Sequence, residues 1–178
     1  MPKKLLLIIT LGIIILGLFS LLKNLSLSNK QNITKSFSEA ETAPNFSLPD
    51  YQGKIVNLSD FSKQPLVINS WAGWCPYCKK ELVDFAKVQE ELKNKIIIIA
   101  IDRAESLAVA KKYSDELGVS NSLVFLLDPA DSFYEAIGGF SMPETIFVDK
   151  DKIVRDHKRG PMDKTEIKNR IKTALSVE

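Results

Sequence analysis

From about residue 44 onward, the chain alternates segments that have the apolar pattern of strands with segments that have the pattern of helices. Residues 45–61 alternate apolar and polar positions around Gln52 and Gly53, which predicts a short β-hairpin. Continuous apolar runs predict three strands covered on both faces, at 65–71, 95–102 and 122–128. Apolar stripes with helical spacing predict amphipathic helices over 76–93, 104–117 and 162–175.

The C-terminal third adds a second hairpin to this pattern. A short helix is predicted near 131–137, and residues 145–149 and 152–157 predict two strands joined across Lys150 and Asp151. Strands that alternate with helices, followed by a hairpin and a helix, are typical of an α/β domain. The expected architecture is therefore a central mixed β-sheet flanked by helices, with an N-terminal β-hairpin extension.

The N-terminus has a different character. Residues 5–22 carry no charge, and as a helix they would reach roughly 27 Å, close to the thickness of a bilayer's hydrocarbon core. Lys3 and Lys4 precede the run, which predicts a cytoplasmic N-terminus and a transmembrane signal anchor over residues 1–22. A cleaved signal peptide is the alternative, but the run is longer than a usual signal core and no A-x-A site follows it.

The segment after this anchor is polar, rich in Ser, Asn and Lys, and without a sustained period. We therefore expect residues 23–43 to form a flexible tether and residues 44–178 to form one folded domain outside the cytoplasm. Apart from Lys3 and Lys4, the Lys and Arg residues balance the 22 Asp and Glu residues. This balance does not support a nucleic-acid partner.

The only two cysteines, Cys75 and Cys78, lie three residues apart between a predicted strand and a predicted helix. A structural zinc site needs four ligands, and beyond the cysteines the chain offers a single histidine, His157, so we expect no metal. Covalent haem attachment needs C-x-x-C-H, but Lys79 occupies the position of that histidine. A purely structural disulfide would close a very small loop and would constrain the unfolded chain little.

A reactive pair is the reading that the spacing favours. A thiol where a strand meets the start of a helix lies near unpaired N–H groups and the positive end of the helix dipole, which lower its pKa. Cys75 is therefore the expected nucleophile, and Cys78, one turn inside the helix, is expected to resolve the mixed disulfide. Pro76 suits the first helical turn, where its missing N–H costs nothing.

Three segments of the chain resemble one protein family. "WAGWCPYC" resembles a thioredoxin-fold active site, and "APNFSLPDYQGKIVNLSDF" and "GGFSMPETIFVDKDKIVRDHKRGPM" resemble the hairpins of its redoxin branch. Together they extend from Ala43 to the C-terminus. The chain is most similar to the membrane-anchored, extracytoplasmic TlpA, ResA and DsbE/CcmG proteins, which reduce disulfides, often during cytochrome c maturation.

This resemblance implies a thioredoxin fold and a thiol–disulfide oxidoreductase that works without a cofactor. The implied substrate is a disulfide in an exported protein, with apocytochrome c or an assembly factor favoured, and an integral membrane thiol donor would supply the electrons. The implied place is the bacterial periplasm or the outer face of the cytoplasmic membrane. A disulfide oxidase or isomerase, and a client-binding module with a vestigial disulfide, remain as alternatives.

The resemblance also assigns roles to residues around the cysteines. Pro143 matches the cis-proline beside the active site, and the backbone of Met142 would pair with a substrate strand. Glu81 matches an acidic residue that can carry protons during exchange, and a solvated helix charge is the alternative reading. Glu144 matches the acid of the P-E-T motif and is expected to help bind substrate.

Three further residues are expected to border the substrate: Trp74, Pro76 and Tyr77. Asn69 departs from thioredoxin, which has a buried aspartate at the matching position. The departure shifts the expected proton transfer to Glu81.

Overall fold

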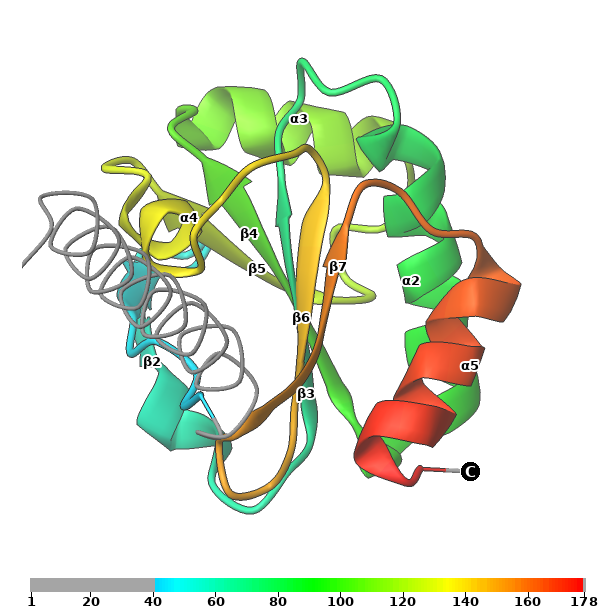
Figure 1. Cartoon of the computed structure of the whole chain (residues 1–178). Coiled ribbons are helices and arrows are strands. Elements are labelled where there is room, and N and C mark those ends of the chain that lie inside the picture. Colours follow the sequence, from blue (N-terminus) through cyan, green and yellow to red (C-terminus); the bar gives the residue numbers. More distant parts are fainter. Residues whose placement is uncertain (1–40, 178) are drawn as a thin grey trace, which may run out of the picture. The chain divides into compact units, whose positions relative to one another are not determined.

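The structure, a computed structural model, describes residues 41–177 (Figure 1). Its centre is a five-stranded mixed sheet with the strand order β5-β4-β3-β6-β7. Strands β3, β4 and β5 run parallel, whereas β6 and β7 run antiparallel to their neighbours. The strands are β3 (Leu66–Trp71), β4 (Ile97–Arg103), β5 (Val124–Asp128), β6 (Glu144–Val148) and β7 (Val154–Arg159).

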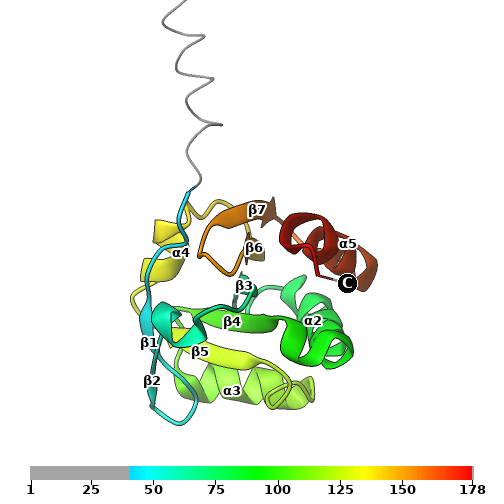
Figure 2. The same ribbon diagram turned by 90° about the horizontal axis from the view of Figure 1, so that it is seen from below.

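Helices and a separate hairpin cover the two faces of this sheet (Figures 1 and 2). One face carries three long helices: α2 (Cys78–Leu92), α3 (Leu107–Glu116) and α5 (Lys164–Leu175). The other face carries a short helix, a two-stranded hairpin and a 3₁₀ turn: α4 (Ser132–Ala136), β1 (Ser47–Pro49), β2 (Ile55–Asn57) and η1 (Leu58–Phe61). A second 3₁₀ turn, η2 (Lys93–Lys95), ends α2. The predicted α/β architecture with its N-terminal hairpin is therefore present.

Strand β3 is the middle strand of the sheet, and all six of its residues are buried. Because side chains alternate along a strand, Ile68 contacts the core under the hairpin, whereas Val67 contacts the core under α2 and α5. A strand covered on both faces needs a continuous apolar run, which explains the pattern of this segment. Its carboxyl end delivers the chain directly to the two cysteines.

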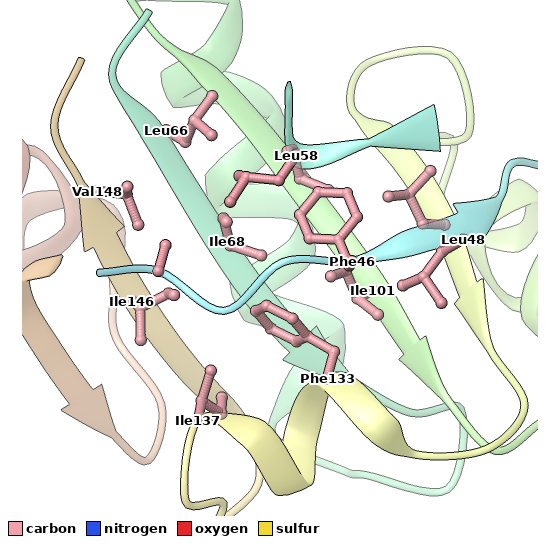
Figure 3. Close-up of a cluster of buried hydrophobic side chains, with 13 residues drawn as sticks. Phe46, Leu48, Leu58, Leu66, Ile68, Ile101, Phe133, Ile137, Ile146 and Val148 are labelled. Carbon is pink, nitrogen blue, oxygen red and sulfur yellow. The ribbon is translucent and has the colours of Figure 1, made fainter. Parts of the chain in front are cut away.

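The core beneath the N-terminal hairpin joins the extension to the sheet (Figure 3). Phe46 packs edge-to-face against Phe133 of α4, with ring centroids 5.9 Å apart. Leu48 and Leu58 complete the cover over Ile68 and its neighbours. The hairpin is therefore an integral layer of the domain.

The first described residues refine the expected domain boundary. Thr42 forms a bridge with Ile153, and the amide of Ala43 donates to the carbonyl of Lys152 at 2.8 Å. Ala43 is also buried in the core. Pairing with the sheet thus begins before Pro44, and residues 41–43, expected to end the tether, belong to the fold.

The predicted transmembrane segment, residues 5–22, lies outside the described residues, as does the tether over residues 23–40. Between residues 41 and 177, no helix is long and apolar enough to cross a bilayer.

Replacing Phe46 with alanine tests whether the hairpin is an integral layer. Because this ring is 8% exposed and packs on Phe133, Phe46→Ala should lower the free energy of unfolding by about 3–5 kcal/mol. Ile55 of the same hairpin is 51% exposed, so Ile55→Ala should change the free energy by no more than about 0.5 kcal/mol. Urea unfolding measures both, and equal effects would contradict an integral hairpin.

Candidate active site

The two cysteines form a disulfide in the turn between β3 and α2. Cys75 is 1% exposed and Cys78 is fully buried, so both sulfur atoms lie beneath the surface in this oxidised state. The amide of Cys78 donates to the carbonyl of Cys75 at 3.3 Å and to its Sγ at 3.2 Å. That second bond would stabilise a Cys75 thiolate after reduction, as expected for the nucleophile.

Helix α2 begins two residues later than the sequence pattern predicts. It starts at Cys78, and Pro76 and Tyr77 lie in the turn before it. The predicted start at Pro76 was therefore wrong, and Cys78 is the first helical residue instead of lying one turn inside. The reason is that the Cys78 amide closes a tight turn onto Cys75, which delays the first regular helical bond.

Side chains from α3 and the segment before it hold the cysteine turn in place. The amide of Gly73 donates to Glu105 Oε2 at 2.6 Å, and the Tyr113 hydroxyl donates to the carbonyl of Cys75 at 3.3 Å. The Tyr113 ring also packs 5.5 Å from the fully buried ring of Trp71. A Cβ atom on Gly73 would lie 3.1 Å from the Glu105 carboxylate, so a glycine suits this close approach.

Glu81 is buried in the first turn of α2, which makes the solvated helix charge the wrong alternative for this residue. Its carboxyl group accepts hydrogen bonds from the Met162 amide at 2.9 Å and from Asn69 Nδ2 at 3.1 Å. Burial raises the pKa of Glu81 to about 8, although these two donors act against the shift. Glu81 can therefore gain and lose a proton near neutral pH, as a proton carrier must.

Asn69 orients this carboxyl group from β3. Its amide nitrogen donates both to Glu81 Oε2 and, at 3.0 Å, to Thr145 Oγ1 in β6. An aspartate at this position would place two carboxylates against each other in a buried site, which is costly when both are charged. The asparagine is thus compatible with a titratable group at Glu81.

The residues predicted to border the substrate lie in two loops. Trp74 and Tyr77 are 61% and 63% exposed, and Pro76 between them is exposed as well. Met142 is half-buried and packs on the apolar cluster that contains both cysteines, and the Met142–Pro143 peptide is cis, as the resemblance implies. That Trp74, Pro76, Tyr77 and Met142 contact a substrate stays a prediction.

Glu144 lies beneath the surface, where it binds the protein's own backbone. It is fully buried, and its Oε2 accepts from the amides of Phe140 and Ser141 at 2.8 and 3.0 Å. His157 Nε2 lies 2.7 Å from Oε1, and Arg159 Nε donates to the same oxygen at 3.2 Å. Burial acts to raise the pKa of Glu144, but the two amides and His157 outweigh it and hold the pKa below its ordinary value.

Sequence reasoning missed several residues around the site. Asp102, at the end of β4, is fully buried beside Trp71 in the sheet register, and burial together with the nearby Glu105 raises its pKa. Asp102 ends a continuous apolar run, which is a weak signal that could have been noticed. His157, which the sequence left without a role, is a partner of Glu144.

In residues 41–177, no cluster of three His, Cys, Asp or Glu side chains could hold a metal ion.

Comparison with protein families identifies the chain. The Redoxin family matches residues 38–175. The chain belongs to the Redoxin family. Among redoxin relatives, the thiol–disulfide oxidoreductase ResA of Bacillus subtilis is 30% identical over 160 residues, which cover 87% of this chain and 86% of that protein. The thiol:disulfide interchange protein DsbE of Allochromatium vinosum is 32% identical over 127 residues, 68% of this chain and 66% of the relative.

Solved structures show the same thioredoxin-like fold. A thiol:disulfide interchange protein of Chlorobium tepidum superposes with a TM-score of 0.68 at 23% identity, covering 78% of this chain and 98% of that one. The lipoprotein thioredoxin Etrx1 of Streptococcus pneumoniae gives 0.65 at 26% identity, with coverages of 73% and 99%. With the Cys75–Cys78 disulfide in the corresponding fold, this redoxin is a thiol–disulfide oxidoreductase of the DsbE and ResA type.

Replacing Glu81 with glutamine tests its raised pKa. The pKa is about 8 in the folded protein and about 4.3 in an unfolded chain, so the folded state binds this proton more tightly. The resulting stabilisation is complete below about pH 4 and is lost as the pH rises to about 8. Between pH 5 and 8, the free energy of unfolding of wild type should therefore fall by about 2–4 kcal/mol relative to Glu81→Gln.

Glu91 supplies the control for this measurement. Its hydrogen bonds from Lys164 and Lys168 lower its pKa to about 2, so Glu91 is ionised in both states throughout the window. Glu91→Gln should differ from wild type by the same free energy at pH 5 and pH 8. A constant difference for Glu81→Gln as well, in urea unfolding of the oxidised proteins, would show that Glu81 has no raised pKa.

Proposed function

We propose that this redoxin is an extracytoplasmic, membrane-tethered reductant of disulfides in exported proteins. The observation that carries the proposal is the Cys75–Cys78 disulfide at the start of α2 with the buried, titratable Glu81 in the first turn of the same helix. Residues 1–22 would anchor the domain, and residues beyond them would connect it to the membrane. The ResA and DsbE relatives and the charge pattern at the N-terminus support this arrangement.

The reaction would begin with the reduced dithiol. The Cys75 thiolate attacks one sulfur of a client disulfide, forming a mixed disulfide and releasing the other client sulfur as a thiolate. Cys78 then loses its proton and attacks Cys75 Sγ, which breaks the mixed disulfide and leaves the Cys75–Cys78 disulfide. Two electrons have passed to the client, and the two client thiolates take up two protons.

Glu81 is the candidate base for the second step. It lies three residues beyond Cys78 in the same helix, and its pKa near 8 allows it to accept a proton at neutral pH. Re-reduction reverses the sequence, with an integral membrane thiol donor as the proposed source of electrons. The donor would attack Cys75, and Glu81 would return the proton to Cys78.

The electrostatics of the cysteine turn favour the reducing direction. A strongly oxidising couple stabilises its reduced form, usually through positive charge beside the thiolate. Tyr77, between the cysteines, carries no such charge, and Glu81 supplies no positive charge in either protonation state. The Cys78 amide remains as a local donor to Cys75 Sγ, which supports nucleophilic attack without a full charge.

The client is proposed from the relatives and the chemistry together. The DsbE and ResA relatives are named for thiol–disulfide chemistry. Apocytochrome c or a protein that assembles it is the favoured client class, as the resemblance of the sequence implies. Exposed Trp74 and Tyr77 would contact such a client beside the disulfide. Disulfide oxidation or isomerisation by the same cysteines, or client binding without turnover, are the competing functions.

Trapping the mixed disulfide tests the proposal. Cys78→Ser cannot resolve the intermediate, so clients should stay covalently linked to Cys75 in cells, and reduction of the isolated sample should release them. Enrichment of apocytochrome c or an assembly factor would support the specific role. Mass spectrometry of the linked proteins provides the measurement.

Two control variants are needed to interpret the trapping experiment with Cys78→Ser. Cys75→Ser retains Cys78 but lacks the nucleophile, so it should link few or no clients. Equal trapping by both variants would contradict the division of labour between the cysteines. A double serine variant that keeps full function in cells would favour a binding module and overturn the proposed chemistry.

A further inference from the structure

Residues 137–143 connect α4 to β6, and we call the last five of them, 139–143, the Met142 loop. Glu144, directly after the loop, accepts the amides of Phe140 and Ser141 with a single carboxylate oxygen. The carboxylate itself is fully buried. A buried acceptor with two backbone donors fixes the direction of the loop, because losing it would leave two amides to find other partners.

The other oxygen of Glu144 is held from β7. His157 Nε2 lies 2.7 Å from Oε1, and Arg159 donates to the same atom at 3.2 Å. The guanidinium of Arg159 also lies 5.9 Å from the ring centroid of Phe140, which is 82% exposed. The carboxylate therefore has a partner at each oxygen, and its position is set by the neighbouring strand.

Helix α4 holds the opposite side of the loop. The Tyr134 hydroxyl donates to the carbonyl of Ser141 at 3.1 Å, and the amide of Gly139 donates to the carbonyl of Tyr134 at 2.9 Å. A Cβ atom on Gly139 would lie only 2.3 Å from the Tyr134 ring. This close approach requires glycine at that position.

Met142 is the exception within this held loop. The carbonyl of the next residue, Pro143, accepts from the amide of Gly160 at 2.9 Å. By contrast, neither the N–H nor the C=O of Met142 has a hydrogen-bond partner among residues 41–177. Its side chain packs on the apolar cluster that contains Cys75 and Cys78. The N–H and C=O of Met142, which we call its open backbone groups, therefore belong to a residue that contacts the disulfide cluster.

We propose that Glu144, held by His157 and Arg159, is a positioning residue that presents the open backbone groups of Met142 to an extended client segment. The inference rests on the proposed function, because the client is the disulfide-containing polypeptide of that proposal. Glu144 touches no reacting atom, and it acts by keeping the Met142 loop in one conformation. An extended peptide would then form backbone hydrogen bonds with Met142, as in strand addition to a sheet.

Glu144→Gln tests this role, because the amide keeps the shape of the side chain but removes its charge. The reduced protein is mixed with a short peptide closed by a disulfide between two cysteines. Tryptophan fluorescence then follows the oxidation of the protein as the peptide is reduced. The half-saturating peptide concentration should rise roughly tenfold, while the maximal rate stays within about twofold. The rate with 5,5′-dithiobis(2-nitrobenzoate), which has no peptide backbone to pair, should stay within about twofold of wild type.

Asp149 provides a matched control at the other end of the same hairpin. It accepts the amides of Asp151 and Ile153 at 2.8 and 3.0 Å and an arginine, Arg155, at 2.6 Å, which closely parallels Glu144. Asp149→Asn should lower thermal stability as Glu144→Gln does. It should leave the half-saturating peptide concentration unchanged.

The outcomes separate this inference from the proposed function. If wild type reduces neither substrate, the proposed function fails. If wild type reduces both and Glu144→Gln either matches it or loses both activities in parallel, the positioning role is wrong. The positioning role is also wrong if Asp149→Asn raises the half-saturating peptide concentration as much as Glu144→Gln does. A wild-type rate that does not saturate with the peptide would overturn it as well.

A milder variant keeps the test decisive should Glu144→Gln not fold. His157→Phe preserves a ring on β7 but removes the hydrogen bond to Glu144 Oε1. We expect it to raise the half-saturating peptide concentration roughly threefold and to leave the small-disulfide rate unchanged. An unchanged peptide dependence in this variant would contradict the proposal.

Discussion

The carboxyl group of Glu81 joins four parts of the fold around the disulfide. It projects from the first turn of α2, accepts the amide of Met162 ahead of α5, and meets Asn69 of β3, which in turn reaches Thr145 of β6. All of these contacts lie out of water, where an unmatched polar group is costly. The helix that carries Cys78 is therefore held in one position against the central strand, and the group that holds it is also one that can exchange a proton.

Two other buried or partly buried acids hold the loops around the cysteines, and their surroundings differ in a way that divides their roles. Glu144 accepts two amides and Arg159 and contacts His157, and the amides and His157 hold its pKa below the ordinary value. Glu81 receives only two neutral donors, and desolvation prevails. Glu105 anchors the amide of Gly73 in the cysteine turn. The number and charge of the partners thus shift the pKa values of Glu81 and Glu144 in opposite directions.

The elements of the sheet could be predicted because each followed a simple pattern. Residues 65–71 and 95–102 read as buried strands and are β3 and β4. The helix predicted over 104–117 is α3, and Gly118, just after it, adopts a positive φ of 69°. The cysteine pair was evident from spacing. The start of α2 was not, because a turn that closes on a sulfur atom leaves no periodic signal. Contacts between distant segments were equally hidden, since nothing near His157 indicates that it faces Glu144.

The equilibrium reduction potential of the Cys75–Cys78 couple, measured against glutathione at pH 7, tests the reducing role most directly. A neutral residue between the cysteines and an acid in the first turn of the helix both withhold stabilisation from the thiolate, so we expect a potential more negative than about −200 mV. A potential near about −120 mV, which is typical of a strong disulfide oxidant, would contradict that role.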